Sequence, residues 1–111
     1  MASILTIRAT SQAPIDFQLL DGGNPIDLTG FTVELRLSDN TGATKSFNTT
    51  DSPAKLAVVD AVNGKLRLFP DTPDFASATI YYGFFWIIDG SGKRHAVSEN
   101  ENFSITVIPD F

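Results

Sequence analysis

The sequence predicts an all-β fold, an antiparallel sandwich of about seven to eight strands. Apolar and polar residues alternate without interruption from Phe31 to Ser38, which is the period of a strand with one buried and one solvated face. Shorter runs of the same kind recur along the chain between clusters of Gly, Asn, Asp and Pro. No segment has a helical period longer than one turn, so two packed sheets are the architecture that these observations favour.

The first half of the chain is expected to contain strands at residues 5–8, 15–19 and 31–38, and a weak edge strand within residues 43–53. The cluster from Asp21 to Pro25 separates the second strand from the third, because its two glycines supply the positive φ that turns require. Thr, Ser and Asn are frequent in residues 43–53, which is typical of a loop and a short edge strand.

The second half is expected to contain strands at residues 56–59, 66–69, 79–89, 94–98 and 103–107. The first two form a predicted hairpin, since the pair Asn63 and Gly64 between them suits a tight turn. Pro70 and Pro73 then interrupt the sheet, because proline cannot donate a backbone hydrogen bond.

Length and composition limit the class of protein to which the chain can belong. One β-sandwich domain over residues 1–111 is expected, because a chain of 12.0 kDa can bury roughly two-thirds of the surface that its unfolded form exposes. The formal net charge of −5 and the scattered basic residues are unfavourable for binding phosphate backbones or anionic lipids. Nucleic acid and membranes are therefore not expected as partners, and the absence of cysteine excludes disulfides and thiol catalysis.

The sequence offers little material for catalysis. Its one histidine, His95, follows a hairpin turn, and no G-x-S-x-G motif is present, so an activated serine is not predicted. The aspartates lie in or beside turns, where Asp usually bonds its own backbone, and they lack the spacing of a calcium loop. We expect no enzyme activity, no catalytic or metal-binding residues and no cofactor.

The strand at residues 79–89 is apolar on both faces. The even-numbered side chains are expected in the core, and they are Ile80, Tyr82, Phe84, Trp86 and Ile88. The odd-numbered face carries Tyr81, Phe85 and Ile87 around Gly83, and two interpretations of it are open. Either another segment covers it, or the three side chains form an exposed patch that binds a partner. Tyr81, Phe85 and Ile87 are thus the candidate partner interface.

Six segments, taken in order, resemble those of one family: residues 6–8 (TIR), 14–19 (PIDFQL), 21–23 (DGG), 25–33 (PIDLTGFTV), 58–66 (VVDAVNGKL) and 81–90 (YYGFFWIIDG). They resemble the immunoglobulin-like domains of tailed-phage virion proteins, notably the N-terminal domain of upper-baseplate proteins of the BppU type. The resemblance implies an immunoglobulin-like β-sandwich. It also implies a non-enzymatic joint that docks a receptor-binding or fibre module onto the phage tail.

The function that we expect is that of a virion structural protein, a baseplate or tail subunit or adaptor that acts by self-association and docking. Its expected partners are further copies of itself and other virion proteins, and its expected location is the virion, after synthesis in the bacterial host cytoplasm. Because the sequence ends at Phe111 without a coiled coil or distal domain, a stand-alone subunit that decorates the capsid is an alternative.

A carbohydrate-binding or adhesion module is a further alternative from another class. In that case Tyr81, Tyr82 or Trp86 would stack on sugar rings, and nearby Asp and Asn side chains would bind hydroxyl groups. A sugar-binding aromatic side chain must be exposed, whereas Trp86 is expected in the core.

Overall fold

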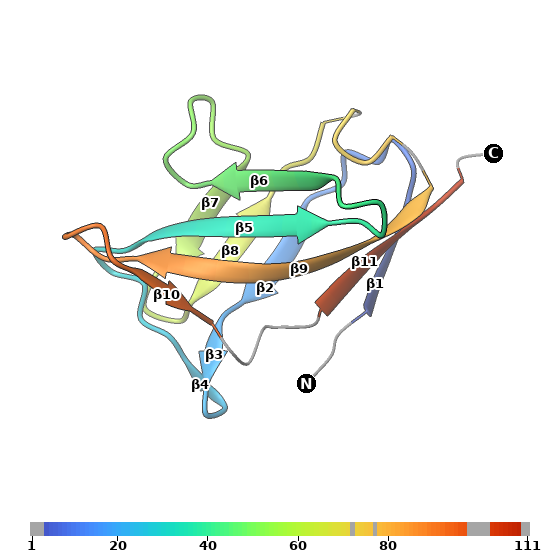
Figure 1. Ribbon diagram of the computed structural model, residues 1–111. Helices are drawn as coiled ribbons and strands as arrows, with labels where there is room; N and C mark the ends of the chain where they lie inside the picture. The colour runs from blue at the N-terminus through green and yellow to red at the C-terminus, as the bar shows by residue number, and fades with distance from the viewer. Residues whose placement is uncertain (1–3, 72, 77, 98–102, 110–111) are drawn as a thin grey trace.

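Eleven β-strands and no helix form the described part of this computed structural model, residues 4–71, 73–76, 78–97 and 103–109 (Figure 1). The strands are β1 (Ile4–Arg8), β2 (Ile15–Gln18), β3 (Leu20–Asp21), β4 (Asn24–Pro25), β5 (Thr32–Ser38), β6 (Thr44–Asn48), β7 (Leu56–Asp60), β8 (Lys65–Leu68), β9 (Thr79–Ile88), β10 (Arg94–Ala96) and β11 (Phe103–Ile108). The all-β prediction is confirmed. The sequence did not indicate β3 and β4, two residues each, which form because the expected turn at residues 21–25 closes as a tight hairpin.

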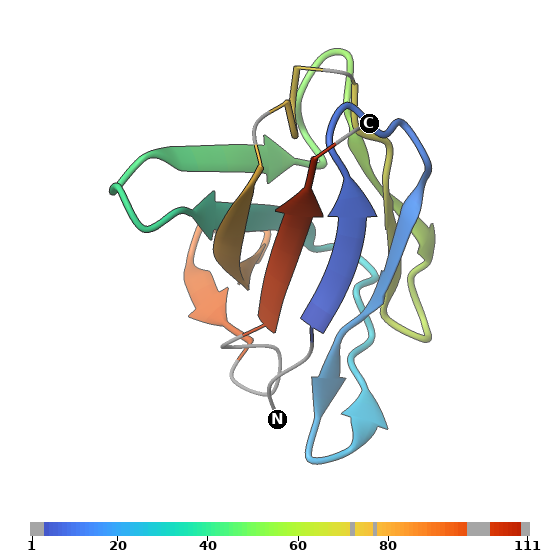
Figure 2. The ribbon, with the colours of Figure 1, turned by 90° about the vertical axis from the view of Figure 1, so that its right-hand side faces the viewer.

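The strands form two facing sheets and a small ribbon (Figure 1). The larger sheet has the order β1-β11-β9-β5-β6, and β10 pairs with β9 beyond the start of β11. The smaller sheet has the order β2-β8-β7, and the β3-β4 ribbon projects from one end of the sandwich. Neighbouring strands are antiparallel except β1 and β11, which lie side by side and run in the same direction (Figure 2). This architecture is compatible with an immunoglobulin-like sandwich.

The core lies between the two sheets. Leu35 on β5 and Leu66 on β8 are fully buried and contribute to it from opposite sides. Phe85 on β9 lies at its centre, with its ring 5.1 Å from that of Phe17 and 5.6 Å from that of Phe103. Aromatic contacts of this kind join β2, β9 and β11, so the two sheets are held together by rings as well as by aliphatic side chains.

The expected orientation of β9 is wrong. Pairing with β5 sets Phe85 opposite Leu35, so the odd-numbered side chains of β9 face the core, and Tyr81 is only 6% exposed. The even-numbered side chains face outward, and Ile80 and Tyr82 are 42% and 54% exposed. Alternation alone cannot orient a strand that is apolar on both faces, because the register with its neighbour decides which face is buried.

Gly83 fits the inward face of β9. A Cβ atom there would lie 2.5 Å from Cδ2 of Leu37 and 2.5 Å from Cζ of Phe103. The glycine thus leaves the space into which these two buried side chains pack.

Candidate interaction surfaces

The three residues predicted to form a partner interface lie in or against the core. Phe85 is fully buried, and the ring of Tyr81 packs edge-on against that of Phe75 at 5.7 Å. Burial raises the pKa of the Tyr81 phenol above its ordinary value, and the charge of Asp39 adds to this effect. Ile87 is partly buried and packs against the core. The exposure on which this prediction rested is therefore absent for Tyr81 and Phe85, because the smaller sheet covers that side of β9.

The opposite side of β9 carries a row of large apolar side chains, which we call the outer row: Ile80, Tyr82, Phe84, Trp86 and Ile88. Ile80 and Tyr82 are exposed, and the other three are half-buried. Phe84 and Trp86 contact each other edge-on, with ring centroids 5.5 Å apart. The prediction that Trp86 lies in the core is wrong, since its side chain belongs to this outward face.

A cluster of charged groups covers one end of the outer row. Glu34 on β5 is only 6% exposed, and its two carboxylate oxygens accept hydrogen bonds from Arg36, at 3.0 Å, and from Arg94 on β10. The guanidinium carbon of Arg94 lies 5.0 Å from the centre of the Trp86 ring. The indole N–H of Trp86 is buried and has no hydrogen-bond partner among the described residues. Two guanidinium groups share one carboxylate, so the cluster carries a net positive charge.

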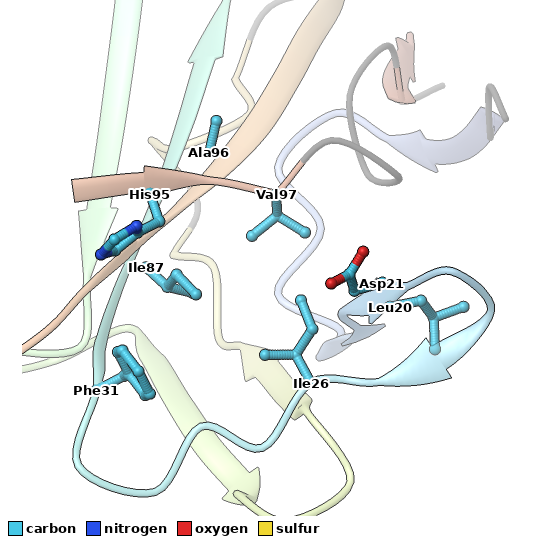
Figure 3. A pocket seen from close by; sticks show the side chains of 8 residues that line it. All are labelled: Leu20, Asp21, Ile26, Phe31, Ile87, His95, Ala96 and Val97. Carbon is cyan, nitrogen blue, oxygen red and sulfur yellow. The ribbon is translucent and has the colours of Figure 1, made fainter.

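A second surface feature is a cleft of about 350 Å³ at the end of the sandwich, which we call the β10 cleft (Figure 3). It is lined by Leu20, Asp21, Ile26, Phe31, Ile87, His95, Ala96 and Val97. One wall comes from β10 and the residue after it, and the other from the β3-β4 ribbon and the segment that leads into β5. Most of the lining side chains are apolar.

His95 stands at the rim of this cleft and bonds a turn residue. Its Nε2 lies 3.2 Å from Oδ2 of Asp89, while Oδ1 of Asp89 accepts hydrogen bonds from the Ser91 hydroxyl and from the Lys93 backbone N–H. The Ser91 hydroxyl, then Lys93 and His95, lower the pKa of Asp89 to about 2. Asp89 thus holds the β9-β10 turn.

The same pattern recurs in another turn. Asp39 accepts hydrogen bonds from the hydroxyl and the backbone N–H of Thr41 and from the backbone N–H of Ala43. These bonds, that of the Thr41 hydroxyl first, lower the pKa of Asp39 below its ordinary value. The prediction that turn aspartates bond their own backbone is confirmed for Asp39 and Asp89.

Within residues 4–71, 73–76, 78–97 and 103–109, no three His, Cys, Asp or Glu side chains are grouped so that they could hold a metal ion. The same residues contain no helix with the length and hydropathy needed to cross a bilayer.

The sequence predicted neither the charged cluster around Glu34 nor the β10 cleft. The alternation from Phe31 to Ser38 places Glu34 and Arg36 on the same polar face of β5, but Arg94 lies 60 residues beyond Glu34 and joins them only through pairing of β9 with its neighbours. The β10 cleft combines Leu20 with Val97, and no local pattern connects two segments so far apart in the chain.

The fold and these surfaces define an all-β sandwich module with an aromatic outer sheet face and an apolar cleft at one end. The chain belongs to the BppU N-terminal domain family, whose model matches residues 7–110. The structure is similar to the N-terminal domain of phage TP901-1 ORF48, with a TM-score of 0.61 and 15% sequence identity, over 98% of this chain and 86% of that one. At this identity the similarity shows the fold alone.

A comparison with curated proteins found no match. The family match confirms the resemblance noted in the sequence and supports a structural role in a bacteriophage, and the structural match agrees with it in fold. The chain is thus a bacteriophage structural protein, and its domain belongs to a family of baseplate-protein domains.

Proposed function

We propose that this chain is a non-enzymatic baseplate or tail subunit that associates with further copies of itself through the outer row of β9 and docks onto other virion proteins. It does so in the virion, after synthesis in the host cytoplasm. The observation that carries the proposal is the outward exposure of Ile80 and Tyr82, at 42% and 54%, in continuity with three further apolar side chains. Contiguous apolar surface on a soluble protein usually marks a contact with a partner.

The face around the outer row is large enough for a stable contact. β9 has ten residues, which at the rise of a strand gives a length of about 33 Å. Five strands lie side by side in this sheet, so its width is about 19 Å at the usual spacing. The product, about 600 Å² in projection, is comparable to the ~800 Å² of accessible surface per partner in a standard interface.

Charge favours a head-to-tail contact over a face-to-face one. Among the described residues, the outward side of the larger sheet carries Arg8, Arg36 and Arg94 but only one acidic side chain, Glu34. The whole chain has a formal charge of −5, so the rest of the molecule is acidic. Two outward faces would repel each other, whereas one outward face would attract the acidic remainder of the next copy. Head-to-tail contacts of this kind close into rings when the rotation between copies permits.

Light scattering over a concentration series tests this proposal. The wild type is compared with Tyr82→Asp, which places a charge in the outer row, and with Val59→Asp, which places a charge at a 50% exposed valine of the smaller sheet. We expect a discrete oligomer for the wild type and for Val59→Asp, and a folded monomer for Tyr82→Asp. Monomeric wild type at about 1 mM, or a Tyr82→Asp protein that retains the wild-type oligomer, would contradict self-association through the outer row.

A further inference from the structure

We propose that the free edge of β10 and the β10 cleft together bind an extended segment of a partner protein. The segment adds a strand to the larger sheet beyond β10 and places a large apolar side chain in the cleft. This site lies beside the outer row of β9, on the edge of the sheet, and its ligand is a different one: a strand-forming peptide with alternating apolar residues.

Backbone geometry identifies the free edge. The backbone N–H of Val97 donates to the carbonyl of Phe85 at 3.1 Å, and that of Asp89 donates to the carbonyl of Lys93 at 3.0 Å, so the backbone groups of the odd-numbered residues in this segment point toward β9. Backbone groups of successive strand residues point to opposite sides. The N–H and C=O groups of Arg94 and Ala96 therefore point away from β9, toward the outside of the sheet.

No strand in the described part of the chain pairs with this edge. β10 pairs with β9 alone. Within the described residues β1 pairs only with β11, from Ile4 with Ser104 onward. Backbone donors and acceptors at such an edge are a template for pairing with another chain.

The side chains of β10 do not block an incoming strand. Arg94 is directed onto the outer face, where its guanidinium lies over Trp86 and bonds Glu34. Ala96 is exposed and small. Proline, a bulge or a freely standing charge are common protections of sheet edges, and residues 94–96 contain neither proline nor a bulge.

The apolar lining of the cleft indicates which side chains the bound segment would carry. Alternate residues of an added strand point to the same side as His95 and Val97, and on that side lie the apolar walls formed by Leu20, Ile26 and Phe31 (Figure 3). A volume of about 350 Å³ is within the range of small-molecule pockets, which is roughly 300 to 1,000 Å³, so the cleft has room for a large side chain. Backbone pairing at β10 provides the orientation of the segment, and the cleft selects an apolar residue.

Two blocked synthetic peptides test the proposal, Ac-TFTLTK-amide and its polar counterpart Ac-TSTSTK-amide. Amide hydrogen exchange is followed by NMR. In the free protein the Ala96 amide is expected to exchange rapidly and the His95 amide slowly. The apolar peptide should slow exchange at Ala96 and bind about tenfold more tightly than the polar one, because it buries at least one large side chain.

Two proline variants provide a matched control. Ala96→Pro removes the outward N–H of β10 and should abolish binding of the apolar peptide. Ser46→Pro removes an outward N–H on β6, at the far edge of the same sheet, and should leave binding unchanged. Tyr82→Asp should also bind the peptide normally, so this result is independent of self-association through the outer row.

Each of the following results would overturn the proposal: a slowly exchanging Ala96 amide in the dilute free protein, equal affinity for the two peptides, no measurable binding of the apolar peptide at about 5 mM, or equal loss of binding in both proline variants. Slow exchange at Ala96 that appears only as the protein concentration rises would identify a second copy as the occupant. That result would overturn the assignment of the edge to a separate partner.

Discussion

The orientation of β9 can be tested by truncating two adjacent phenylalanines. Phe85 is fully buried and contacts the rings of Phe17 and Phe103, whereas Phe84 is half-buried and contacts Trp86 on the outward face. Replacing a buried phenylalanine by alanine costs about 3 to 5 kcal/mol, because the apolar contacts are lost and a cavity remains. Phe84→Ala removes one edge-on ring contact and should cost about 1 kcal/mol.

Urea unfolding followed by circular dichroism measures both free energies. With an m-value of ~1.5 kcal/mol/M, Phe85→Ala should lower the midpoint by about 2 to 3 M and Phe84→Ala by less than about 1 M. If Phe85→Ala does not fold, leucine variants replace the alanine variants. Phe85→Leu retains most of the side-chain volume and should still lower the free energy of unfolding more than Phe84→Leu. A larger loss for either substitution at Phe84 than at Phe85 would refute the orientation of β9 described above.

Two further predictions concern turns. The pKa of Asp89 is about 2 in the folded protein against 3.8 for an ordinary aspartate, so its carboxylate stabilises the fold above about pH 4, and this contribution is lost as the pH falls toward 2. Asp89→Asn should therefore lower the melting temperature most above pH 4, and an equal effect at pH 2 and pH 6 would contradict the role of the carboxylate. Gly64 has a φ of +67°, and a Cβ there would lie 2.7 Å from the carbonyl oxygen of Ile26 and 2.8 Å from that of Leu19. Gly64→Ala should cost about 2 kcal/mol or more in urea unfolding, whereas Gly42→Ala, at a φ of +87° with no atom within 4 Å, should cost about 1 kcal/mol.

The local pattern of the sequence predicted most strands. The stretch expected at residues 31–38 is β5, Thr32–Ser38, and the stretch expected at 103–107 is β11, Phe103–Ile108. Alternation succeeds in these strands because each has one apolar and one more polar face, so the same pattern gives both the strand and its orientation.

The outer row of β9 and the β10 cleft could not be predicted in the same way. In β9 both faces are apolar, and only the pairing of Phe85 with Leu35 shows which one is buried. Gly83 was a usable signal, because a glycine within an apolar strand often marks a close approach by a neighbour. The β10 cleft depends on strand order and on the position of the β3-β4 ribbon, and these follow from contacts between distant segments.

The parallel pairing of β1 with β11 has a mechanical consequence. The two strands have five register pairs, from Ile4 with Ser104 to Arg8 with Ile108, and they run in the same direction. Tension applied to the beginning of β1 and to the end of β11 therefore pulls the two strands past each other along their length. Under such shear all the hydrogen bonds of the ladder carry the load at once, whereas antiparallel terminal strands pulled from one end would separate bond by bond. A sandwich with this pair at its edge can resist a pulling force transmitted through its two ends.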